Sequence, residues 1–314
     1  MLRLRFFNVG DGDAALIEEI SGASAFRMLV DCGRPDVPGP EPRMTCAAHL
    51  RRAGVSWLDK VLITHLHADH EGGLAKVLDC AQTSEVIASY VPKAQGARLK
   101  DNPKALKSVR NMNLHLNRWV EDIGRLRGAG VPIQEIRQSQ LGVRLTAKLT
   151  ADFIVPDAGA LKTQCDIWDG LFARRRTSEK VRYQAAKLCN PTSLRLRLHY
   201  AGRQAELSAD CFGSLWDRGP LEPCDIFKVP HHGDAKALTE RLVRGLRPRY
   251  AVISCGREYI EAKDRPSMSA VRMLRDAGAE VWYTDAFDDG TRLVMSWPSV
   301  DFVIRDDGTI LTPM

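Results

Sequence analysis

The chain opens with the alternating pattern of a half-buried strand. Leu2, Leu4 and Phe6 occupy every second position, with Arg3 and Arg5 between them, and this period of two is typical of a strand with one buried face. Further apolar runs predict strands at 14–18, 28–33 and 61–64. The glycines of the next segment, Glu71-Gly-Gly73, lead into a predicted helix that contains Leu74 and Val77.

Residues 91–190 have a different pattern. Apolar residues recur at helical spacing from Leu106 to Leu126, and Gly128 ends the run. A weaker helical stretch covers about 166–188, and the segment between the two, 143–155, has the pattern of a strand. We therefore predict that 91–190 is mainly helical.

After residue 190 the strand pattern returns. Leu194, Leu196 and Leu198 alternate with polar residues, and further apolar runs predict strands at 226–229, 250–254 and 280–284. Ser267 is a predicted N-cap for one more helix, which Gly278 ends. Strands on both sides of a helical segment predict an α/β fold.

The composition is that of an ordinary globular protein. The 314 residues are 44% hydrophobic and 27% charged, which excludes a disordered, collagen-like or coiled-coil protein, and the length alone is compatible with about two domains. No run of 18 apolar residues predicts a membrane span. The eight cysteines form no C-x-x-C pair, and the N-terminus lacks the continuous apolar core of a signal peptide. We expect free thiols, a cytoplasmic location and no membrane partner.

The net charge of +6 is unevenly distributed. Residues 91–190 contain 19 basic and 9 acidic residues, a balance of +10, whereas the remaining residues have a balance of −4. The densest basic run consists of Arg174, Arg175, Arg176, Lys180 and Arg182. Such a run either binds the phosphates of a nucleic acid or forms a solvated helix face, and a charge run alone is more often the latter.

The strongest chemical signal is a loop that follows the apolar run at 61–64. His65, His67, Asp69 and His70 lie within six residues, and imidazole with carboxylate suits zinc and other first-row metals. The loop can turn His65 and His67 toward one ion and Asp69 and His70 toward another. A closed structural zinc site is the alternative, but such sites usually contain cysteine, which this loop lacks.

The pattern His65-x-His67-x-Asp69-His70 resembles the signature of metallo-β-lactamase-fold hydrolases. The resemblance implies an αββα sandwich with two metal ions at one edge. It also implies a bridging aspartate after a later strand, where Asp210 stands, and a final histidine, for which we choose His232. The neighbouring His231 then either faces the substrate, as an acid or a phosphate contact, or has a structural role.

Five segments are similar to the soluble hydrolase domain of ComEC-type DNA-uptake proteins, namely 7–13, 29–33, 190–194, 228–233 and 284–285. These similarities cover about 1–90 and 190–290, while 91–190 has no counterpart that we recognise. ComEC proteins also contain a membrane channel, and this chain has no such segment. We therefore predict a single domain over 1–314, with the basic, largely helical segment 91–190 inserted within it.

Two positions depart from the wider family. Many members have a metal-binding histidine about twenty residues before the bridging aspartate, and Asn190 stands there. ComEC-like sequences tend to have asparagine or serine at this place. A neutral carbonyl oxygen is a weaker ligand than imidazole, which leaves open whether the ion held there is Zn²⁺ or a harder ion such as Mn²⁺. For the two metal ions together, Zn²⁺ is the favoured ion and Mn²⁺ the alternative. Arg265 stands where a histidine is expected before Pro-Ser.

Several other residues have two interpretations. Asp31 either binds a ligand histidine or closes its turn, Asp11 and Asp13 either line the pocket or belong to a plain turn, and Lys228 is either a pocket residue or solvated. Cys189 and Cys211 are more simply buried thiols than metal ligands. His115 has no partner in the pattern, which favours a helix-face position.

These observations predict a two-metal hydrolase, in which a metal-bridging hydroxide attacks a phosphodiester. Asp69 would bind one ion and orient the nucleophile, and Asp210 would bridge both. The resemblance favours DNA as the substrate. One alternative is hydrolysis of a small phosphodiester, a lactone or a peptide bond. Another is a component of a protein complex whose metal site is structural or becomes active only with its partner.

Overall fold

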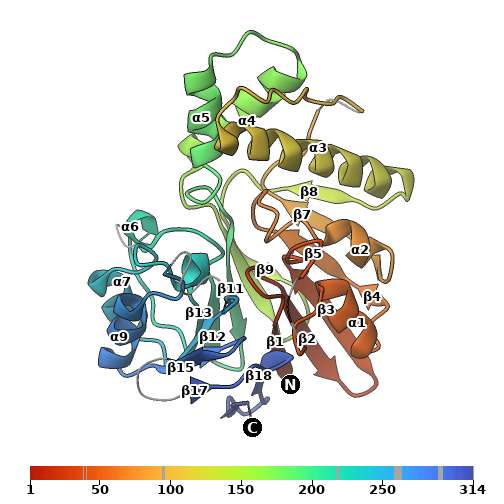
Figure 1. Ribbon diagram of the computed structural model, residues 1–314. Coiled ribbons are helices and arrows are strands. Elements are labelled where there is room, and N and C mark those ends of the chain that lie inside the picture. Colours follow the sequence, from red (N-terminus) through yellow and green to blue (C-terminus); the bar gives the residue numbers. More distant parts are fainter. Residues whose placement is uncertain are drawn as a thin grey trace.

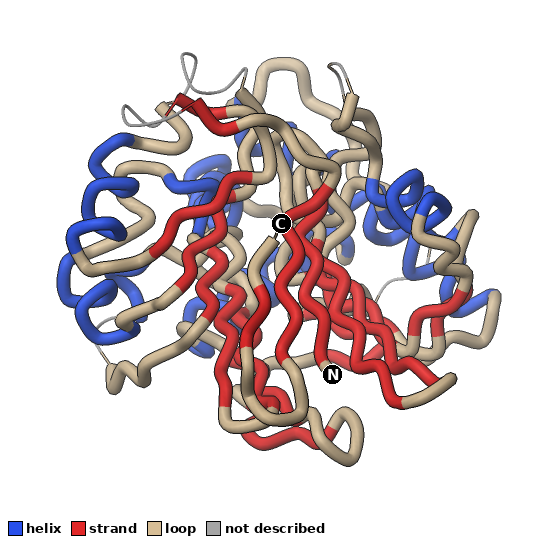
Figure 2. Tube along the Cα trace, turned by 90° about the horizontal axis from the view of Figure 1, so that it is seen from below, coloured by secondary structure: helices blue, strands red, loops and turns tan. Residues whose placement is uncertain are grey.

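The computed structural model describes residues 1–37, 39, 41–93, 96–216, 219–257, 264–288 and 293–313. Two large β-sheets face one another, and helices cover their outer sides (Figures 1 and 2). This arrangement confirms the predicted αββα sandwich.

The first sheet begins with an antiparallel part and continues with a parallel part. Its order is β19 (Ile310–Leu311), β18 (Ser299–Ile304), β1 (Leu2–Phe7), β2 (Ala15–Ser21), β3 (Ser24–Val30), β5 (Lys60–Ile63), β7 (Val86–Ala88) and β8 (Ile133–Glu135). Neighbours from β3 to β8 run parallel. The histidine loop follows β5, so it starts at the carboxyl edge, where ligands bind in open α/β sheets.

The second sheet repeats this plan with seven strands. Its order is β15 (Glu280–Tyr283), β14 (Tyr250–Ile253), β13 (Ile226–Lys228), β12 (Arg203–Leu207), β11 (Arg195–Tyr200), β10 (Thr150–Ile154) and β9 (Gln140–Arg144). Neighbours from β12 to β15 run parallel. Asp210 follows β12, and His231 and His232 follow β13 within the short 3₁₀ turn η1 (Pro230–Gly233).

Helices cover the outer face of each sheet (Figure 1). Those on the first sheet are α1 (Cys46–Arg52) and α2 (Leu74–Leu78). Those on the second are α6 (Gly213–Trp216), α7 (Glu240–Leu246) and α9 (Met268–Asp276). Two small sheets complete the described strands, β4 (Trp57–Leu58) with β6 (Gln82–Thr83) and β16 (Phe287–Asp288) with β17 (Leu293–Val294).

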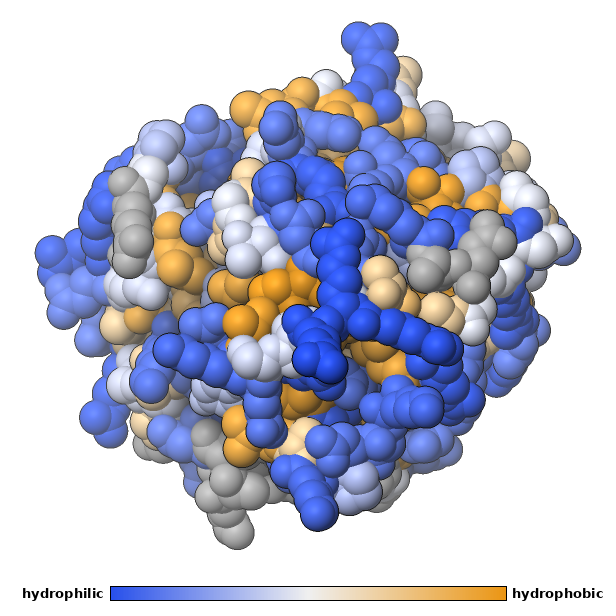
Figure 3. Space-filling view, turned by 90° about the horizontal axis from the view of Figure 1, so that it is seen from above, coloured by the Kyte–Doolittle hydropathy of each residue, from blue (hydrophilic) through white to orange (hydrophobic). Residues whose placement is uncertain are grey.

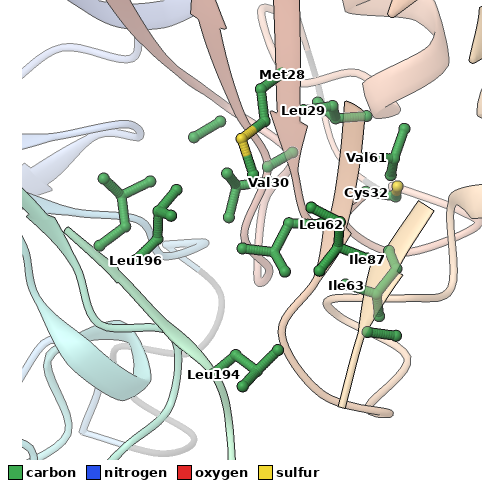
Figure 4. Close-up of a cluster of buried hydrophobic side chains, with 14 of the residues drawn as sticks. Met28, Leu29, Val30, Cys32, Val61, Leu62, Ile63, Ile87, Leu194 and Leu196 are labelled. Atoms are coloured by element: carbon green, nitrogen blue, oxygen red, sulfur yellow. The ribbon is translucent and has the colours of Figure 1, made fainter. Parts of the chain in front are cut away.

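The two sheets pack through alternating side chains (Figure 4). Met28, Val30 and Leu62 lie on the side of the first sheet that faces Leu196, whereas Leu29 lies on the opposite side. All five are buried, and one continuous cluster contains residues of both sheets. Full burial of such a side chain contributes about 1.5–3 kcal/mol, so the packing fixes the relative position of the two carboxyl edges.

The segment 91–190 contains α3 (Lys107–Gly128), α4 (Ala158–Phe172) and α5 (Glu179–Lys187). In Figure 1 these helices lie together at one end of the molecule, above both sheets. The buried face of α3 includes Met112, Leu116 and Trp119, at the predicted helical spacing. The same segment also supplies β8 to the first sheet and β9 and β10 to the second. It is therefore part of both sheets as well as a helical cover.

The thiols behave as the sequence predicts. All eight cysteines are free, and seven of them are buried. None of the helices within the described residues has both the length and the apolar character needed to span a bilayer.

Candidate metal centre

One group of ligand-type atoms lies beside the end of β5. His65 Nε2 is 3.1 Å from His67 Nδ1 and 3.7 Å from Asp210 Oδ2. The other ring nitrogen of His65, Nδ1, lies 3.1 Å from Thr64 Oγ1. The three residues His65, His67 and Asp210 thus turn one nitrogen or oxygen each toward a common point, with these atoms within 4.8 Å of one another.

A second group of ligand-type atoms shares the same aspartate. His232 Nε2 is 3.4 Å from Asp69 Oδ2, and His70 Nε2 is 3.3 Å from Asp210 Oδ1. Asp210 therefore presents Oδ2 to the first group and Oδ1 to the second. The structure brings together all six histidines and carboxylates that the sequence proposes as ligands.

Hydrogen bonds on the far side of the rings fix their orientation. His70 Nδ1 lies 2.8 Å from Asp31 Oδ2, and His232 Nδ1 donates to the Ser254 carbonyl at 2.9 Å. Both rings therefore direct Nε2 toward Asp210. Asp31 also accepts the backbone N–H of Thr64 at 2.9 Å, so this carboxylate holds the histidine loop as well as His70.

The ionisation states differ between the two groups of ligand-type atoms. Burial lowers the pKa of His67 to about 4 and lowers the pKa of His65 well below its ordinary value, so both imidazoles are neutral. Burial alone would raise the pKa of Asp210, but His70 and His232 hold it well below its usual range. Against the effect of burial, Asp210 and Asp31 raise the pKa of His70 well above its ordinary value, and Asp210 with Asp69 raises the pKa of His232 to about 9. Without an ion these two rings are therefore protonated beside Asp210. A bound divalent ion would take the place of their inward-facing protons, because neutral imidazole and ionised carboxylate are the forms that bind divalent metals.

Three buried atoms in this cluster test whether a metal fits. His70 Nε2, His232 Nε2 and Asp210 Oδ1 have no hydrogen-bond partner within the described part of the chain. His70 Nε2 and His232 Nε2 lie 3.3 and 3.8 Å from Asp210 Oδ1, which is longer than a well-formed hydrogen bond. A divalent ion would satisfy all three, so the donor set fits metal binding.

Asn190 lies beside these ligand-type atoms. It lines a cleft together with His67 and Asp69, and its buried Oδ1 has no hydrogen-bond partner among the described residues. The carbonyl oxygen is therefore available as the weak additional ligand that the sequence proposes.

Lys228 lies beneath the second group and is not solvated. It is buried and donates to Asp13 Oδ2 at 2.7 Å and to the Val229 carbonyl at 3.1 Å. The other oxygen of Asp13, Oδ1, is 3.6 Å from His232 Nδ1. Asp11 lies on the cleft side, where its Oδ2 is 3.9 Å from Arg34 Nη1.

His231 lies between the cluster and the cleft. Its Nε2 is 3.8 Å from Asp210 Oδ2 and lies 2.8 Å from Arg265 Nη2. Burial, together with the charge of Arg265, lowers the pKa of His231 to about 4, although Asp210 opposes the shift. The neutral ring therefore accepts the hydrogen bond from Arg265 at Nε2.

A cleft of about 750 Å³ leads to these groups. Its walls include parts of α3 and α5 and the loop 34–36, and His67, Asp69 and His231 line it as well. The basic residues among its described lining are Arg34, Arg118, Lys187 and Arg265. Figure 3 views the molecule from the side of α3–α5, where hydrophilic side chains surround smaller apolar patches.

The basic run of the sequence lies elsewhere. Arg174, Arg175 and Arg176 are exposed in the turn between α4 and α5, and Lys180 and Arg182 lie on α5. None of these five is among the described residues that line the cleft. Lys187, at the other end of α5, does line it.

One connection was missed by the sequence reasoning. Glu71, fully buried beside His70, accepts hydrogen bonds from His115 Nδ1 at 3.2 Å and Arg118 Nη1 at 3.1 Å. The His115 ring lies 6.0 Å from the His67 ring. His115 and Arg118 are three residues apart on α3, a spacing that places them on one helix face. The spacing of His115 and Arg118, next to the apolar face of the predicted helix, could have indicated that both side chains point toward the protein interior.

The two cysteines beside the ligands are thiols. Burial raises the pKa of Cys189 and of Cys211 to about 12. Neither sulfur belongs to the two groups of ligand-type atoms described above.

Comparison with protein families gives a match over part of the chain. Residues 26–160 match the beta-lactamase superfamily domain. The match includes most of β3, all of β5 and the histidine loop. Over these residues the chain is thus similar to the superfamily that the histidine pattern resembles, while the closer resemblance to ComEC-type proteins remains a prediction.

Solved structures show distant likeness. A CmlA beta-hydroxylase mutant is 16% identical, with 90% of this chain and 52% of that chain covered and a TM-score of 0.45. The metallo-beta-lactamase fold protein YhfI from Bacillus subtilis is 10% identical, with 90% and 96% covered and a TM-score of 0.46. The short form of human tRNase Z is 11% identical, with 80% and 91% covered and a TM-score of 0.38.

The present chain spans about half the length of the CmlA structure. None of the curated proteins compared matches the chain. With identities and TM-scores this low, the likenesses say nothing about the substrate.

Proposed function

We propose that this protein is a two-metal phosphodiesterase that acts on nucleic acid, with DNA as its substrate. The supporting observation is the position of Asp210, which faces two groups of ligand-type atoms at a cleft with four basic lining residues. Two adjacent sites joined by a carboxylate are typical of enzymes that cleave phosphate esters. The proposal treats 1–314 as one catalytic domain, which the core shared by both sheets supports.

The ligands divide between two ions. His65, His67 and Asp210 would hold one ion, with Asn190 as a weak additional ligand. Asp69, His70 and His232 would hold the other, together with Asp210. Bound divalent ions supply Lewis acidity at the phosphate oxygens and lower the pKa of water. The four histidine nitrogens, two in each group, favour Zn²⁺, and the Asn190 oxygen makes Mn²⁺ the alternative.

The protein residues orient the reactants. Asp69 is the more accessible of the two ligand carboxylates, with 20% of its side chain exposed against 2% for Asp210. It therefore both serves as a ligand and can accept a hydrogen bond from the attacking water. His231 lines the cleft beside Asp210 and is placed to contact the scissile phosphate.

The basic run would serve a longer substrate. Arg174, Arg175 and Arg176 are exposed and outside the cleft lining, so they would contact phosphates away from the scissile bond, as would Lys180 and Arg182. The +10 balance of residues 91–190 supports this role. We also propose a cytoplasmic location, which the eight free thiols support.

The test combines metal analysis with substrate assays. The purified protein is analysed for bound metal and incubated, with Zn²⁺ or Mn²⁺, with single-stranded and duplex DNA, RNA and bis-p-nitrophenyl phosphate. We expect cleavage of DNA and a loss of at least about 100-fold in His65→Ala, Asp69→Ala and Asp210→Ala, each with reduced metal content. If all three variants retained full metal content and activity, the assignment would be wrong.

A further inference from the structure

Arg265 is a cleft residue to which the ligand scheme gives no role. It immediately precedes Pro266 and Ser267, the N-cap of α9. Its Nη2 donates to His231 Nε2 at 2.8 Å, and its Nε donates to Asp234 Oδ2 at 3.2 Å. Because a guanidinium has five N–H groups, these two bonds leave other donors for a ligand in the cleft.

The surrounding backbone holds the guanidinium near the ligand cluster. Ser267 donates its backbone N–H to the Gly233 carbonyl at 2.8 Å, and His231 donates its own to the Ala209 carbonyl at 3.1 Å. The loop that carries Arg265 is thus tied to the turn η1, which is tied to the residue before Asp210. His231 lies between the Arg265 guanidinium and the shared carboxylate, with its Nε2 2.8 Å from Arg265 Nη2 and 3.8 Å from Asp210 Oδ2.

The side chain is placed between solvent and the protein interior. It is 16% exposed, and its partner Asp234 is 23% exposed, so the guanidinium is partly desolvated yet reachable from the cleft. Partial desolvation strengthens a charge-assisted hydrogen bond to an incoming anion.

We propose that Arg265 binds the anionic phosphodiester of the substrate and holds it against the two ligand groups. This inference rests on the proposed function and deepens it, because it selects among ester classes. The planar guanidinium can donate two parallel hydrogen bonds to the two non-bridging phosphate oxygens. A lactone or a peptide offers one neutral carbonyl oxygen, so Arg265 favours a phosphodiester over both. A histidine at this position could offer neither the permanent charge nor the paired donors.

Binding of a small phosphodiester tests the proposal without catalysis. Dimethyl phosphate is titrated into the metal-loaded protein by calorimetry, for the wild type and for Arg265→Lys, Arg265→Met and Arg272→Met. Arg272 is exposed on α9, so Arg272→Met removes the same charge outside the cleft and is the matched control. We expect Arg265→Met to weaken binding about 10- to 100-fold, since hydrogen bonds between charged groups are lost. The affinity of Arg265→Lys should fall between those of the wild type and Arg265→Met, because lysine keeps the charge but lacks the paired donors.

Metal content and melting temperature are measured for every variant. Unchanged affinity in Arg265→Met overturns the proposal, as does a wild type that does not bind dimethyl phosphate. Loss of metal or a lower melting temperature in both Arg265 variants also overturns it, since the residue would then be structural.

Hydrolysis provides a second readout. We expect Arg265→Met to lower kcat/KM for bis-p-nitrophenyl phosphate while hydrolysis of the neutral ester p-nitrophenyl acetate is retained. Equal losses on both esters overturn the proposal. A wild type that binds dimethyl phosphate through Arg265 but cleaves no phosphodiester would refute the proposed function and leave this inference standing.

Discussion

At the scale of single residues, the cluster depends on groups that do not themselves face the two metal positions. Asp31 accepts hydrogen bonds from His70 and Thr64, and Ser254 accepts one from His232. Each bond fixes which ring nitrogen points inward. The inward-facing atoms are therefore set in place before any ion binds.

Replacement of Asp31 tests this positioning. Asp31→Ala should weaken metal affinity at the second group by about 10- to 100-fold, because His70 loses its fixed orientation. The affinity is measured by competition with a coloured chelator. Asp276→Asn, an exposed change on α9, is the control and should bind metal like the wild type. Equal affinities for Asp31→Ala and wild type would contradict the prediction.

At the scale of elements, α3 connects the cleft wall to the histidine loop through Glu71. It also buries Asp122, whose Oδ2 has no hydrogen-bond partner among the described residues. Burial and the nearby charge of Glu71 raise the pKa of Asp122 to about 7, against the opposing effect of Arg118 and Arg125. The folded state is therefore more stable when the Asp122 carboxyl group is protonated.

This carboxyl gives a pH-dependent stability. Between its ordinary pKa of 3.8 and about 7, the folded state binds more protons than the unfolded state, so stability falls as the pH rises through this window. In the Asp122→Asn variant the side chain at this position is neutral at every pH, so no charge has to be buried there. We expect the variant to be more stable than the wild type by roughly 1–3 kcal/mol at pH 8, with little difference at pH 4. Urea unfolding at both pH values measures this, and an equal difference at the two would contradict it.

The turn between α4 and α5 gives a second prediction for this scale. Replacement of Arg174, Arg175 and Arg176 together by alanine should weaken binding to single-stranded DNA. It should also reduce the slope of log affinity against log salt by about 2, since up to three phosphate contacts are lost. Fluorescence anisotropy at several salt concentrations measures both. Hydrolysis of bis-p-nitrophenyl phosphate, which is too small to reach the turn, should change little. An unaltered slope would show that these three arginines do not contact DNA and form a solvated surface.

Much of the site was predictable because its ligands are close in sequence or follow strands. His65, His67, Asp69 and His70 occupy one loop, and Asp210 and His232 each follow a parallel strand whose carboxyl end reaches the same edge. The strands themselves were predictable from alternating residues such as Leu194 and Leu196. Local spacing therefore carried both the fold and the ligand set.

The remaining contacts depend on packing between distant segments. Glu71 and His115 are 44 residues apart, and Lys228 and Asp13 are 215 apart, so no local period relates them. The basic run shortly precedes Asn190 in the sequence, and this proximity alone would place it near the metal edge. The helix α5 instead presents Lys187 to the cleft and leaves Arg174–Arg176 at its far end. The direction of the helix, which cannot be read from the composition, decides which basic side chains reach the cleft.

At the scale of the whole molecule, the cluster joins the two sheets. Asp69 and His70 follow a strand of the first sheet, whereas Asp210 and His232 follow strands of the second. An ion bound by both halves would therefore stabilise the contact between the sheets as well as the site. Any ligand that binds only the folded state raises stability by mass action.

Metal removal tests this coupling. Treatment with EDTA should lower the melting temperature, and an excess of Zn²⁺ should restore it. A hundredfold excess over the dissociation constant corresponds to about 2.7 kcal/mol. Asp210→Asn should show a much smaller shift in differential scanning calorimetry. A melting temperature that changes with neither EDTA nor Zn²⁺ would contradict the prediction.

The connections that form the cleft wall have a consequence for substrate choice. Helix α3 joins β7 to β8, which are neighbours in the first sheet, and α4 with α5 joins β10 to β11, which are neighbours in the second. Each connection therefore leaves and re-enters a single sheet. The two connections also pack against each other, for example where Trp168 Nε1 lies 3.3 Å from Met112 Sδ, and together they shape the cleft. A change in either can alter what the cleft admits while the six candidate histidine and carboxylate ligands stay on the strands and loops of the sandwich.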